Sequence, residues 1–307
     1  MKINKPKFWQ NKNSVLSLIF LPVSFLILIL IFFKKKLTKQ RKFKIPIICV
    51  GNIYVGGTGK TPLSIFIAKE LQNHNKKPVI IKKFYSNQND ERLLIEKNDI
   101  PLISEKSRAK SIIIAERKND LVILDDGFQD YSVYKNLNIL CFHGNQLIGN
   151  GFIFPSGPLR ESFNSIKRAQ IIVINGKKNE EFEKKVLQIS KNIQIFYSSY
   201  SLLNIDQFKN KKILAFAGIG NPINFFSLLK LNLDLKKTLS YPDHFDFKKE
   251  ELTKIIKYAR DNDYKILTTE KDYMRIKKYE LPEINFCKIH LDILEREKFF
   301  YTINKYL

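Results

Sequence analysis

The sequence predicts an α/β protein in which a parallel sheet is covered by helices on both faces. Short apolar runs, such as 78–82, 138–142 and 169–175, are typical of buried strands. Between them lie segments with the hydrophobic period of a helix, such as 107–118. The resulting order of strand, helix, strand, helix is the order that builds a parallel sheet.

The segment GNIYVGGTGKTP (51–62) is placed where a phosphate-binding loop would be, between a strand and a helix. The apolar run Lys44–Val50 precedes it, and residues 63–71 continue it with a helical period. The strict pattern G-x-x-x-x-G-K-[ST] requires a glycine where this chain has Tyr54. An ordinary glycine-rich turn is therefore the alternative interpretation.

As a phosphate loop, this segment would bind its ligand through backbone amides at the start of the following helix. Its glycines allow unusual backbone angles and close approach of the ligand. Lys60 would reach the β- and γ-phosphates and Thr61 would hold Mg²⁺, so the predicted cofactors are ATP and Mg²⁺. The residues expected to contact the nucleotide are Gly56, Gly57, Thr58, Gly59, Lys60 and Thr61.

A second element of a nucleotide site is the segment DLVILDDGFQD (120–130), an apolar strand that ends in Asp125 and Asp126. In a parallel sheet this strand end would lie beside the phosphate loop, so that one of the two carboxylates reaches Mg²⁺. An Asp-Gly turn after a core strand is the alternative. Together, the two elements predict a fold similar to that of the P-loop nucleotide-binding proteins.

Composition limits the classes of partner and the cellular environment. The chain has 307 residues, with 53 Lys and Arg against 30 Asp and Glu, for a net charge of +23. Such an excess favours an anionic partner, namely a nucleic acid, an anionic lipid or a phosphorylated substrate, although a compositional bias toward lysine is an equal alternative. The three cysteines lie far apart in apolar runs, which indicates buried thiols in a reducing compartment.

The N-terminal run Ser14–Phe33 has 20 residues without a charge. That length suffices to cross a bilayer core of about 30 Å, so the sequence predicts an N-terminal membrane helix. Bulky residues lead directly into Lys34–Lys36 with no small-residue cleavage site, which indicates an uncleaved anchor. Basic residues are denser on the C-terminal side, which places that side in the cytoplasm. A helix that lies within one leaflet is the alternative.

A second, smaller α/β domain is predicted after a link at 196–210. Its expected strands are 211–217, 265–268 and 286–291, with helices from about Pro222 and over 247–261. The predicted domains are therefore a membrane anchor over 1–40, a P-loop nucleotide-binding domain over 41–200 and the smaller domain over 201–307.

Several segments in order resemble one family. These are VGNIYVGGTGKTP, ILDDGFQDY, GNGFIFPSGPLRES, AFAGIGNP and TTEKD, between Val50 and Asp272. The sequence resembles the tetraacyldisaccharide 4′-kinases, the lipid A 4′-kinases of Gram-negative bacteria, and the N-terminal anchor is typical of them. In this family the shifted glycine is the normal form of the loop.

The resemblance implies an activity, a partner and a location. The γ-phosphate of ATP would be transferred to the 4′-hydroxyl of a tetraacylated lipid A disaccharide 1-phosphate, at the cytoplasmic face of the bacterial inner membrane. Inner-membrane lipid would be the other partner, and neither a nucleic acid nor an obligate protein partner is implied. The alternatives are a membrane-associated P-loop ATPase and a catalytically weakened homologue that binds only lipid or ATP.

The resemblance also implies catalytic residues beyond Lys60. In NDERLL, Asp90 would be the catalytic base and Glu91 a metal-binding or structural carboxylate. A solvated first turn of a helix is the alternative for this acidic pair. His244, in YPDHFDF, would pair with Asp90 and orient it.

Four further residues are expected on the substrate side. Gln129 and Glu161 would face the active site, and Tyr85 would stack on base or substrate. Arg160 would either bind an anionic group of the substrate or pair with a surface carboxylate.

The chain departs from the family in places that bear on the acceptor. Asp130 stands where the family has a histidine, and KKFYSN (82–87) replaces an Arg-Gly-Tyr-Gly run. Asn89 and Arg92 flank the acidic pair in place of glycine and proline. A slower enzyme or an altered acceptor is the open alternative.

Overall fold

The computed structural model describes residues 6–84 and 89–307, without the side chains of Asn89 and Asp90. The chain forms two compact units. Among the described residues, the larger unit contains 6–84, 99–199 and 292–307, and the smaller contains 89–98 and 200–291. These bounds differ from those of the predicted domains, since 89–98 belong to the smaller unit and the C-terminal 292–307 to the larger one.

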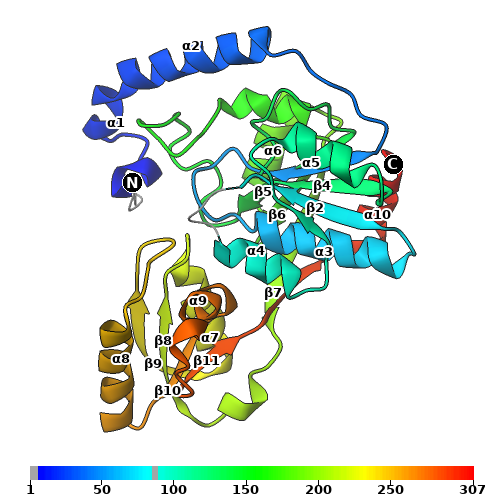
Figure 1. The fold of residues 1–307 in the computed structure, drawn as a ribbon. Helices are drawn as coiled ribbons and strands as arrows, with labels where there is room; N and C mark the ends of the chain where they lie inside the picture. The colour runs from blue at the N-terminus through cyan, green and yellow to red at the C-terminus, as the bar shows by residue number, and fades with distance from the viewer. Residues whose placement is uncertain (1–5, 85–88) are drawn as a thin grey trace. The chain divides into compact units, whose positions relative to one another are not determined.

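An eight-stranded sheet forms the centre of the larger unit, and its strand order is β12-β7-β6-β5-β1-β4-β2-β3 (Figure 1). The neighbours from β3 through to β7 pair in parallel, which confirms the predicted parallel sheet. The strands are β1 (Ile47–Gly51), β2 (Pro78–Lys82), β3 (Leu102–Ile103), β4 (Leu121–Asp125), β5 (Leu137–His143), β6 (Ile171–Asn175), β7 (Gln194–Leu202) and β12 (Ile289–Ile293).

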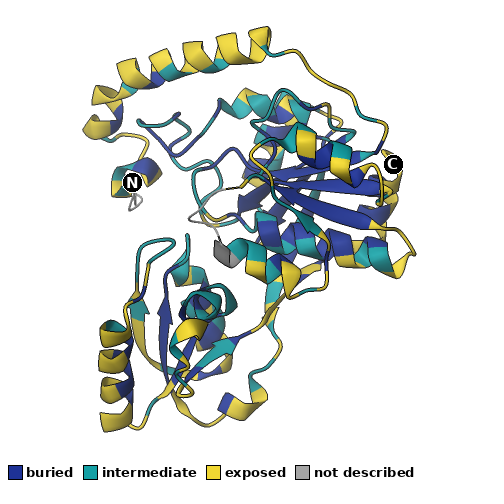
Figure 2. Cartoon of the chain, viewed as in Figure 1, coloured by how far each residue is buried: buried dark blue, intermediate teal, exposed yellow. Residues whose placement is uncertain are grey.

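Both faces of this sheet are covered because its strands are apolar on both sides. Ile47 and Cys49 of β1 belong to a core cluster that also includes residues of α5 (Arg108–Ala115) and α6 (Glu180–Ile189). The alternate residues Ile48 and Val50 are equally buried and face the other way. Figure 1 shows α3 (Lys60–Asn73) on the face opposite α5, and α10 (Arg296–Asn304) adds Phe300 beside Phe66 of α3. Figure 2 shows the central strands buried along their length.

The sheet topology brings the two motifs together. β1 leads into the glycine-rich loop, and β4 ends in Asp125. The two strands are parallel neighbours, with Val50 opposite Asp125, so their carboxyl ends meet at one edge of the sheet. Ligands of such sheets bind outside the carboxyl ends of the strands.

The N-terminal apolar run is divided into two helices. α1 (Val15–Ile19) follows a short 3₁₀ turn, η1 (Lys7–Gln10), and α2 (Leu21–Leu37) begins with Pro22 in its first turn. Within residues 6–84 and 89–307, no helix has both the length and the apolar character needed to span a bilayer. The predicted membrane-spanning helix over Ser14–Phe33 is therefore not confirmed.

The smaller unit contains a four-stranded parallel sheet in the order β11-β10-β8-β9. Its strands are β8 (Lys212–Ala217), β9 (Asp234–Ser240), β10 (Lys265–Thr269) and β11 (Ile284–Cys287). Its helices are α4 (Asn89–Glu96), α7 (Pro222–Asn232), α8 (Lys249–Asp261) and α9 (Glu270–Ile276). Short 3₁₀ turns lie at η3 (Asp206–Phe208) and η4 (Lys277–Tyr279), and η2 (Phe163–Arg168) lies in the larger unit.

One local prediction was wrong. The run expected as one strand over 286–291 is two strands, β11 and β12, which belong to different sheets and are separated at Lys288. Hydrophobic pattern alone does not say which sheet a strand joins. The expected link over 196–210 includes the boundary between the two units after Ser199, but it also contains most of β7. The three cysteines are free and buried, as expected.

Candidate active site

The glycine-rich loop connects β1 to α3 with a backbone that suits a bound phosphate. Gly56 has a φ of 116° and Gly59 a φ of 92°, values that glycine adopts without strain. Gly59 is the N-cap of α3, so the first amides of the helix follow it directly. Such amides lack helical partners and lie at the positive end of the helix dipole, and therefore bind anions.

The buried side chain of Asn52 stabilises this loop through hydrogen bonds. Its Nδ2 donates to the carbonyl oxygen of Tyr54 at 2.7 Å and to Oγ1 of Thr58 at 2.9 Å. Tyr54 occupies the place of the expected first glycine, and its ring is buried in the core. Its hydroxyl accepts a hydrogen bond from Nε2 of Gln10. The chain needs no glycine at this position, because the turns with positive φ fall later in the loop.

Asp125, at the end of β4, is the centre of the site. It is fully buried, and its Oδ2 accepts hydrogen bonds from Oγ1 of Thr61 at 2.9 Å and from Nζ of Lys82 at 2.7 Å. Lys82 is the last residue of β2 and lies opposite Asp125 in the register of β2 and β4. The sequence predicted Thr61 and Asp125 at one site, and the structure brings them within hydrogen-bond distance.

Asp126 lies among three cationic side chains. Nζ of Lys60 is 3.6 Å from Oδ1, and Nη1 of Arg160 contacts both carboxylate oxygens at 3.1 and 3.3 Å. Burial works to raise the pKa of Asp126, but Lys60, Arg160 and Lys82 outweigh it and hold the pKa well below its ordinary value. Asp126 therefore stays ionised at any pH at which the protein works, and Arg160 pairs with a carboxylate of the site.

This depressed pKa predicts a pH dependence of stability. A carboxyl group with a lowered folded-state pKa contributes stability above its unfolded pKa of about 4, and that contribution is lost as the pH falls through the folded pKa. We expect the urea midpoint of Asp126→Asn to fall less steeply than that of the unmodified chain as the pH falls from about 4. The exposed Glu105→Gln is the control. Parallel curves for Asp126→Asn and the unmodified chain would contradict the assignment.

Gln129 and Glu161 form a network beside the carboxylates. Nε2 of Gln129 donates to the carbonyl oxygen of Asn52 and to Oε1 of Glu161, both at 2.9 Å. Oε2 of Glu161 accepts from the hydroxyl of Tyr131 at 2.7 Å and pairs with Arg168. The guanidinium of Arg168 lies 3.9 Å from the ring centre of Phe128. Both predicted residues thus lie at the site, where they link the phosphate loop to the segment after β4.

Asp130, which replaces a histidine of the family, is tied to the same region. Its Oδ2 lies 3.3 Å from Nη1 of Arg108, and Nη2 of Arg108 donates to the carbonyl oxygen of Asp126 at 2.8 Å. Burial works to raise the pKa of Asp130, but hydrogen bonds from Ser132 and the charge of Arg108 lower it overall. The substituted carboxylate has an internal partner in Arg108.

His244 lies in the smaller unit, in a second group of charged residues. Nη2 of Arg275 lies 3.3 Å from Nδ1 of His244, and Nη1 of Arg275 contacts Oδ1 of Asp272 at 2.6 Å. Asp272 is fully buried and also accepts from the amide of Gly218 and the hydroxyl of Thr269. Burial raises the pKa of Asp272, although Arg275 acts in the opposite direction. Arg275 of α9, which is itself held by the buried Asp272, therefore holds the imidazole of His244 at Nδ1.

Glu91 belongs to the same group. Its Oε1 lies 2.8 Å from Nζ of Lys271 and 4.0 Å from Nε2 of His244. The predicted base Asp90 lies beside it in α4, but its side chain is outside the described residues, as is the whole of Tyr85.

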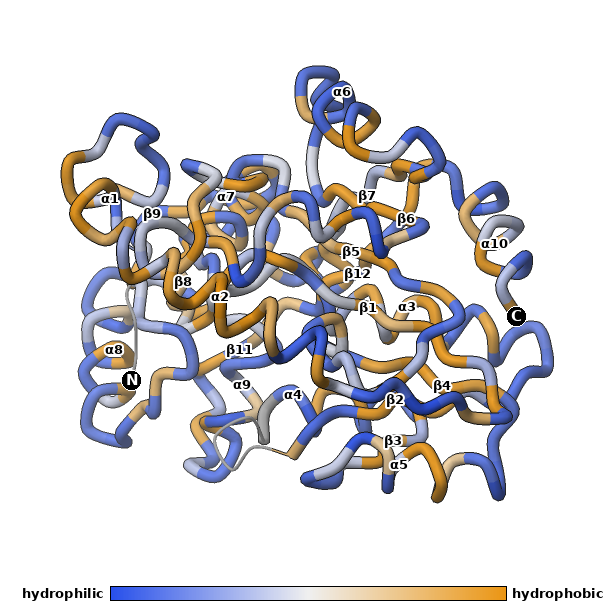
Figure 3. The backbone as a smooth tube through the Cα atoms, turned by 90° about the horizontal axis from the view of Figure 1, so that it is seen from above, coloured by the Kyte–Doolittle hydropathy of each residue, from blue (hydrophilic) through white to orange (hydrophobic). Residues whose placement is uncertain are grey.

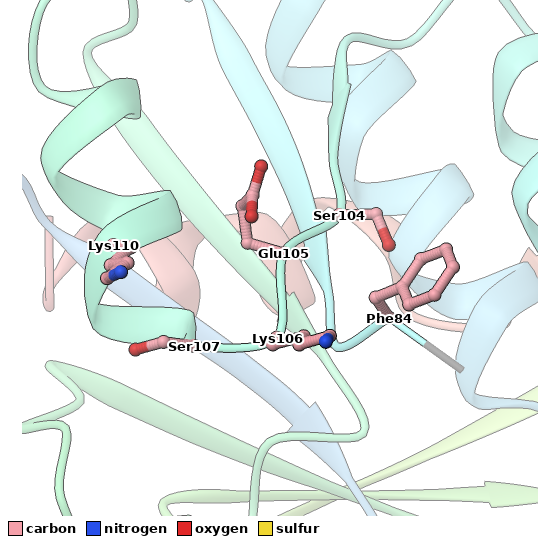
Figure 4. Close-up of a pocket in the computed structure, with 6 residues that line it drawn as sticks. All are labelled: Phe84, Ser104, Glu105, Lys106, Ser107 and Lys110. Carbon is pink, nitrogen blue, oxygen red and sulfur yellow. The ribbon is translucent and has the colours of Figure 1, made fainter. Parts of the chain in front are cut away.

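The larger unit also has an open hollow of about 340 Å³ at the start of α5 (Figure 4). It is lined by Phe84, Ser104, Glu105, Lys106, Ser107 and Lys110. Small-molecule sites are usually enclosed, whereas this hollow is open to solvent. The cluster around Asp125 is therefore the stronger candidate site.

The residues at this cluster fit a magnesium ion. Thr61, Asp125 and Asp126 offer the oxygen donors that Mg²⁺ prefers, and Mg²⁺ in nucleotide sites takes only one or two protein carboxylates. In the part of the chain that the structure describes, Oδ1 of Asp125 is buried and has no hydrogen-bond partner. Such an oxygen is costly unless a donor or a cation meets it. Over the same residues, no three His, Cys, Asp or Glu side chains are grouped as a metal site.

Sequence reasoning missed several residues that contact the predicted ones, among them Asn52, Lys82 and Arg275. It also missed Asp272, which contacts Arg275. Lys82 carried a signal, because a lysine at the carboxyl end of an apolar strand in such a sheet points to its ligand-binding edge. Asp272 carried another, since it ends the quoted segment TTEKD. Asn52 and Arg275 carried none, because their partners are set by the folded chain.

Comparisons with known proteins identify one family. The family model described as tetraacyldisaccharide-1-P 4′-kinase matches residues 16–307. A tetraacyldisaccharide 4′-kinase of Pelagibacter ubique is 41% identical over 305 residues, covering 97% of this chain and 96% of that protein. One from Rickettsia akari is 31% identical over 293 residues, covering 90% of this chain and 89% of that protein.

A solved structure is similar over nearly the whole chain. It is LpxK from Aquifex aeolicus in complex with ATP, with a TM-score of 0.73 and 26% identity. The match covers 95% of this chain and 99% of that chain. Together with the family match, it confirms the resemblance found in the sequence. The chain therefore belongs to the tetraacyldisaccharide-1-P 4′-kinase family.

Proposed function

We propose that this chain transfers the γ-phosphate of ATP to the 4′-hydroxyl of a tetraacylated disaccharide 1-phosphate in lipid A synthesis. The proposal depends chiefly on one observation: Thr61, which follows the phosphate loop, donates a hydrogen bond to Asp125 at the end of β4. Family membership supports the lipid substrate, and the ATP held by the solved relative supports the nucleotide.

The phosphate side of the reaction is positioning and charge stabilisation. The amides after Gly59 and the ammonium of Lys60 would hold the β- and γ-phosphates. A Mg²⁺ ion bound with ATP would be held by Thr61, Asp125 and Asp126, and would neutralise charge on the transferred group. Arg160, 3.1 Å from Asp126, would keep that carboxylate ionised and in place.

On the acceptor side, we propose Asp90 as the base that takes the proton from the 4′-hydroxyl, with His244 orienting it. A guanidinium only donates, so Nδ1 of His244 accepts from Arg275 and Nε2 carries the proton. The Nε2–H group would then donate to a carboxylate of α4, and this placement is supported by Glu91 of that helix, whose Oε1 lies 4.0 Å from Nε2. Lys271 holds Glu91, which suits a structural role for that residue.

The test is ³¹P NMR of the lipid after incubation of the full chain with ATP, Mg²⁺ and a tetraacylated disaccharide 1-phosphate in detergent. The proposal predicts a second, sugar-linked phosphate monoester on the lipid. Release of inorganic phosphate with an unchanged lipid would favour the ATPase alternative, and an unchanged mixture would favour the weakened homologue.

We further propose that α1 and α2 lie in the cytoplasmic surface of the inner membrane. Small polar side chains of the two helices form hydrogen bonds with the rest of the larger unit. Ser24 donates to the carbonyl oxygen of Ile153, and Ser17 contacts Asn150. The outward side chains are large and apolar, among them Phe25 (63% exposed). Figure 3 shows this hydrophobic character along both helices.

This apolar face is of the kind that marks a membrane contact. Lys34–Lys36 complete α2, and each lysine near an anionic lipid surface adds about 1 kcal/mol. A lipid surface therefore satisfies both the apolar face and the cationic end of the helix.

We expect Phe25→Glu with Leu26→Glu to lower binding to vesicles of anionic phospholipid by about a hundredfold, because each apolar side chain contributes at least about 1.5 kcal/mol on burial. Vesicle sedimentation measures the effect. The control is Leu231→Glu, which places the same charge at an exposed leucine of α7. Equal loss in the control, or no loss in the double variant, would contradict the placement.

A further inference from the structure

The fold places the ammonium group of Lys82 directly against the carboxylate of Asp125. It ends β2, opposite Asp125 in the parallel register of β2 and β4, and both strands lie side by side in Figure 1. Lys82 is 5% exposed and Asp125 is fully buried. The ammonium lies 2.7 Å from Oδ2, so this is a buried ion pair of short, charge-assisted geometry.

The two carboxylates of the site are in direct contact with different cations, although the charge of Lys82 also acts on Asp126. Lys60 and Arg160 contact Asp126 at 3.6 and 3.1 Å. Lys82 contacts Asp125 and shares its Oδ2 with the hydroxyl of Thr61. A metal ion that binds Asp125 must therefore compete with a positive charge that already neutralises it, whereas Oδ1 remains without a partner in the described part of the chain.

We propose that Lys82 is a tethered cation that competes with the divalent metal for Asp125 and so makes metal binding depend on the nucleotide. The proposal rests on the metal-binding role proposed for Asp125. The phosphates of a nucleotide offer Lys82 a second anionic partner, so Lys82 can leave Asp125 to the metal when a nucleotide is present. Metal and nucleotide then strengthen each other's binding, and by linkage the coupling is the same in both directions.

Binding of Mn²⁺ alone to the full chain, followed by electron paramagnetic resonance, measures this competition directly. We expect Lys82→Met to tighten Mn²⁺ binding without nucleotide by about tenfold, within the usual range of coupling between sites. Lys77→Met is the matched control, because Lys77 precedes the other end of β2 and is exposed. It should leave Mn²⁺ binding unchanged. Adding a non-hydrolysable ATP analogue should strengthen Mn²⁺ binding in the unmodified chain more than in Lys82→Met.

Removal of Lys82 leaves the buried Asp125 without its cationic partner, so folding is checked by thermal unfolding with and without Mn²⁺. A midpoint that rises with Mn²⁺ more in Lys82→Met than in the unmodified chain also supports the proposal. Should that variant not fold, Lys82→Gln makes the same test, since it keeps a hydrogen-bond donor and removes the charge.

Asp125→Asn separates the two proposals. In one outcome, Asp125→Asn weakens Mn²⁺ binding in the presence of the analogue, while Lys82→Met leaves Mn²⁺ binding without nucleotide unchanged. That outcome would overturn the proposed competition by Lys82 and would support the metal-binding role of Asp125. An Asp125→Asn variant that binds Mn²⁺ as the unmodified chain does would instead overturn the metal role, and the inference about Lys82 with it.

Discussion

Lys60→Ala is expected to lower the rate of phosphoryl transfer to lipid by about 10²–10³-fold, the usual loss when a positioned charge-stabilising group is removed. Lys60 is the first residue of α3 and follows the left-handed Gly59. Its ammonium lies 3.6 Å from Asp126, at the edge of the sheet where the loop and β4 meet. Initial rates of ADP formation at saturating lipid measure the loss.

The matched control is Lys69→Ala, an exposed lysine on the same helix. It removes the same charge from α3 at a distance from the loop and should leave the rate within about twofold, as is usual for surface substitutions. A Lys60→Ala variant with the rate of this control would show that the glycine-rich loop does not bind the phosphates.

Asp90→Ala is expected to lower kcat by about 10²–10⁴-fold, the usual contribution of a general base, with little change in ATP affinity. The effect should fall on transfer to the sugar hydroxyl, because a hydroxyl is a poor nucleophile until its proton is taken. His244→Gln should give a smaller loss of kcat, since this residue is proposed to position the base. The comparison uses kcat from steady-state transfer assays and ATP affinity from equilibrium binding.

Glu91→Gln is the neighbouring control for Asp90→Ala. The two acidic residues are replaced one at a time, and we expect a large loss of kcat only when Asp90 is replaced. A normal rate in Asp90→Ala together with loss of activity in Asp126→Ala would mean that another residue takes the proton.

The phosphate side of the site was largely predictable from the sequence, because it depends on local order. A strand, a turn with several glycines and a helix together fix where Lys60 and Thr61 lie. A second strand that ends in carboxylates must place them at the same edge of a parallel sheet. The displaced glycine was no obstacle, since Tyr54 packs inward and the positive φ angles fall at Gly56 and Gly59.

Contacts between distant residues were not predictable in the same way. Lys82 meets Asp125 only because β2 and β4 are neighbours in register, and strand order does not follow from hydrophobic period. The contact between Arg275 and Nδ1 of His244 likewise depends on how α9 packs. At the N-terminus, length and hydropathy over Ser14–Phe33 predicted a spanning helix, but the chain forms two helices, and α2 has Pro22 in its first turn.

We propose that this chain binds ATP and phosphorylates a lipid sugar. The most direct test is transfer of radiolabel from γ-labelled ATP to a tetraacylated disaccharide 1-phosphate in detergent micelles, with the unmodified chain and with Lys60→Ala. We predict labelled lipid with the unmodified chain and almost none with the variant. Labelled inorganic phosphate without labelled lipid, or equal labelling by both proteins, would contradict the account.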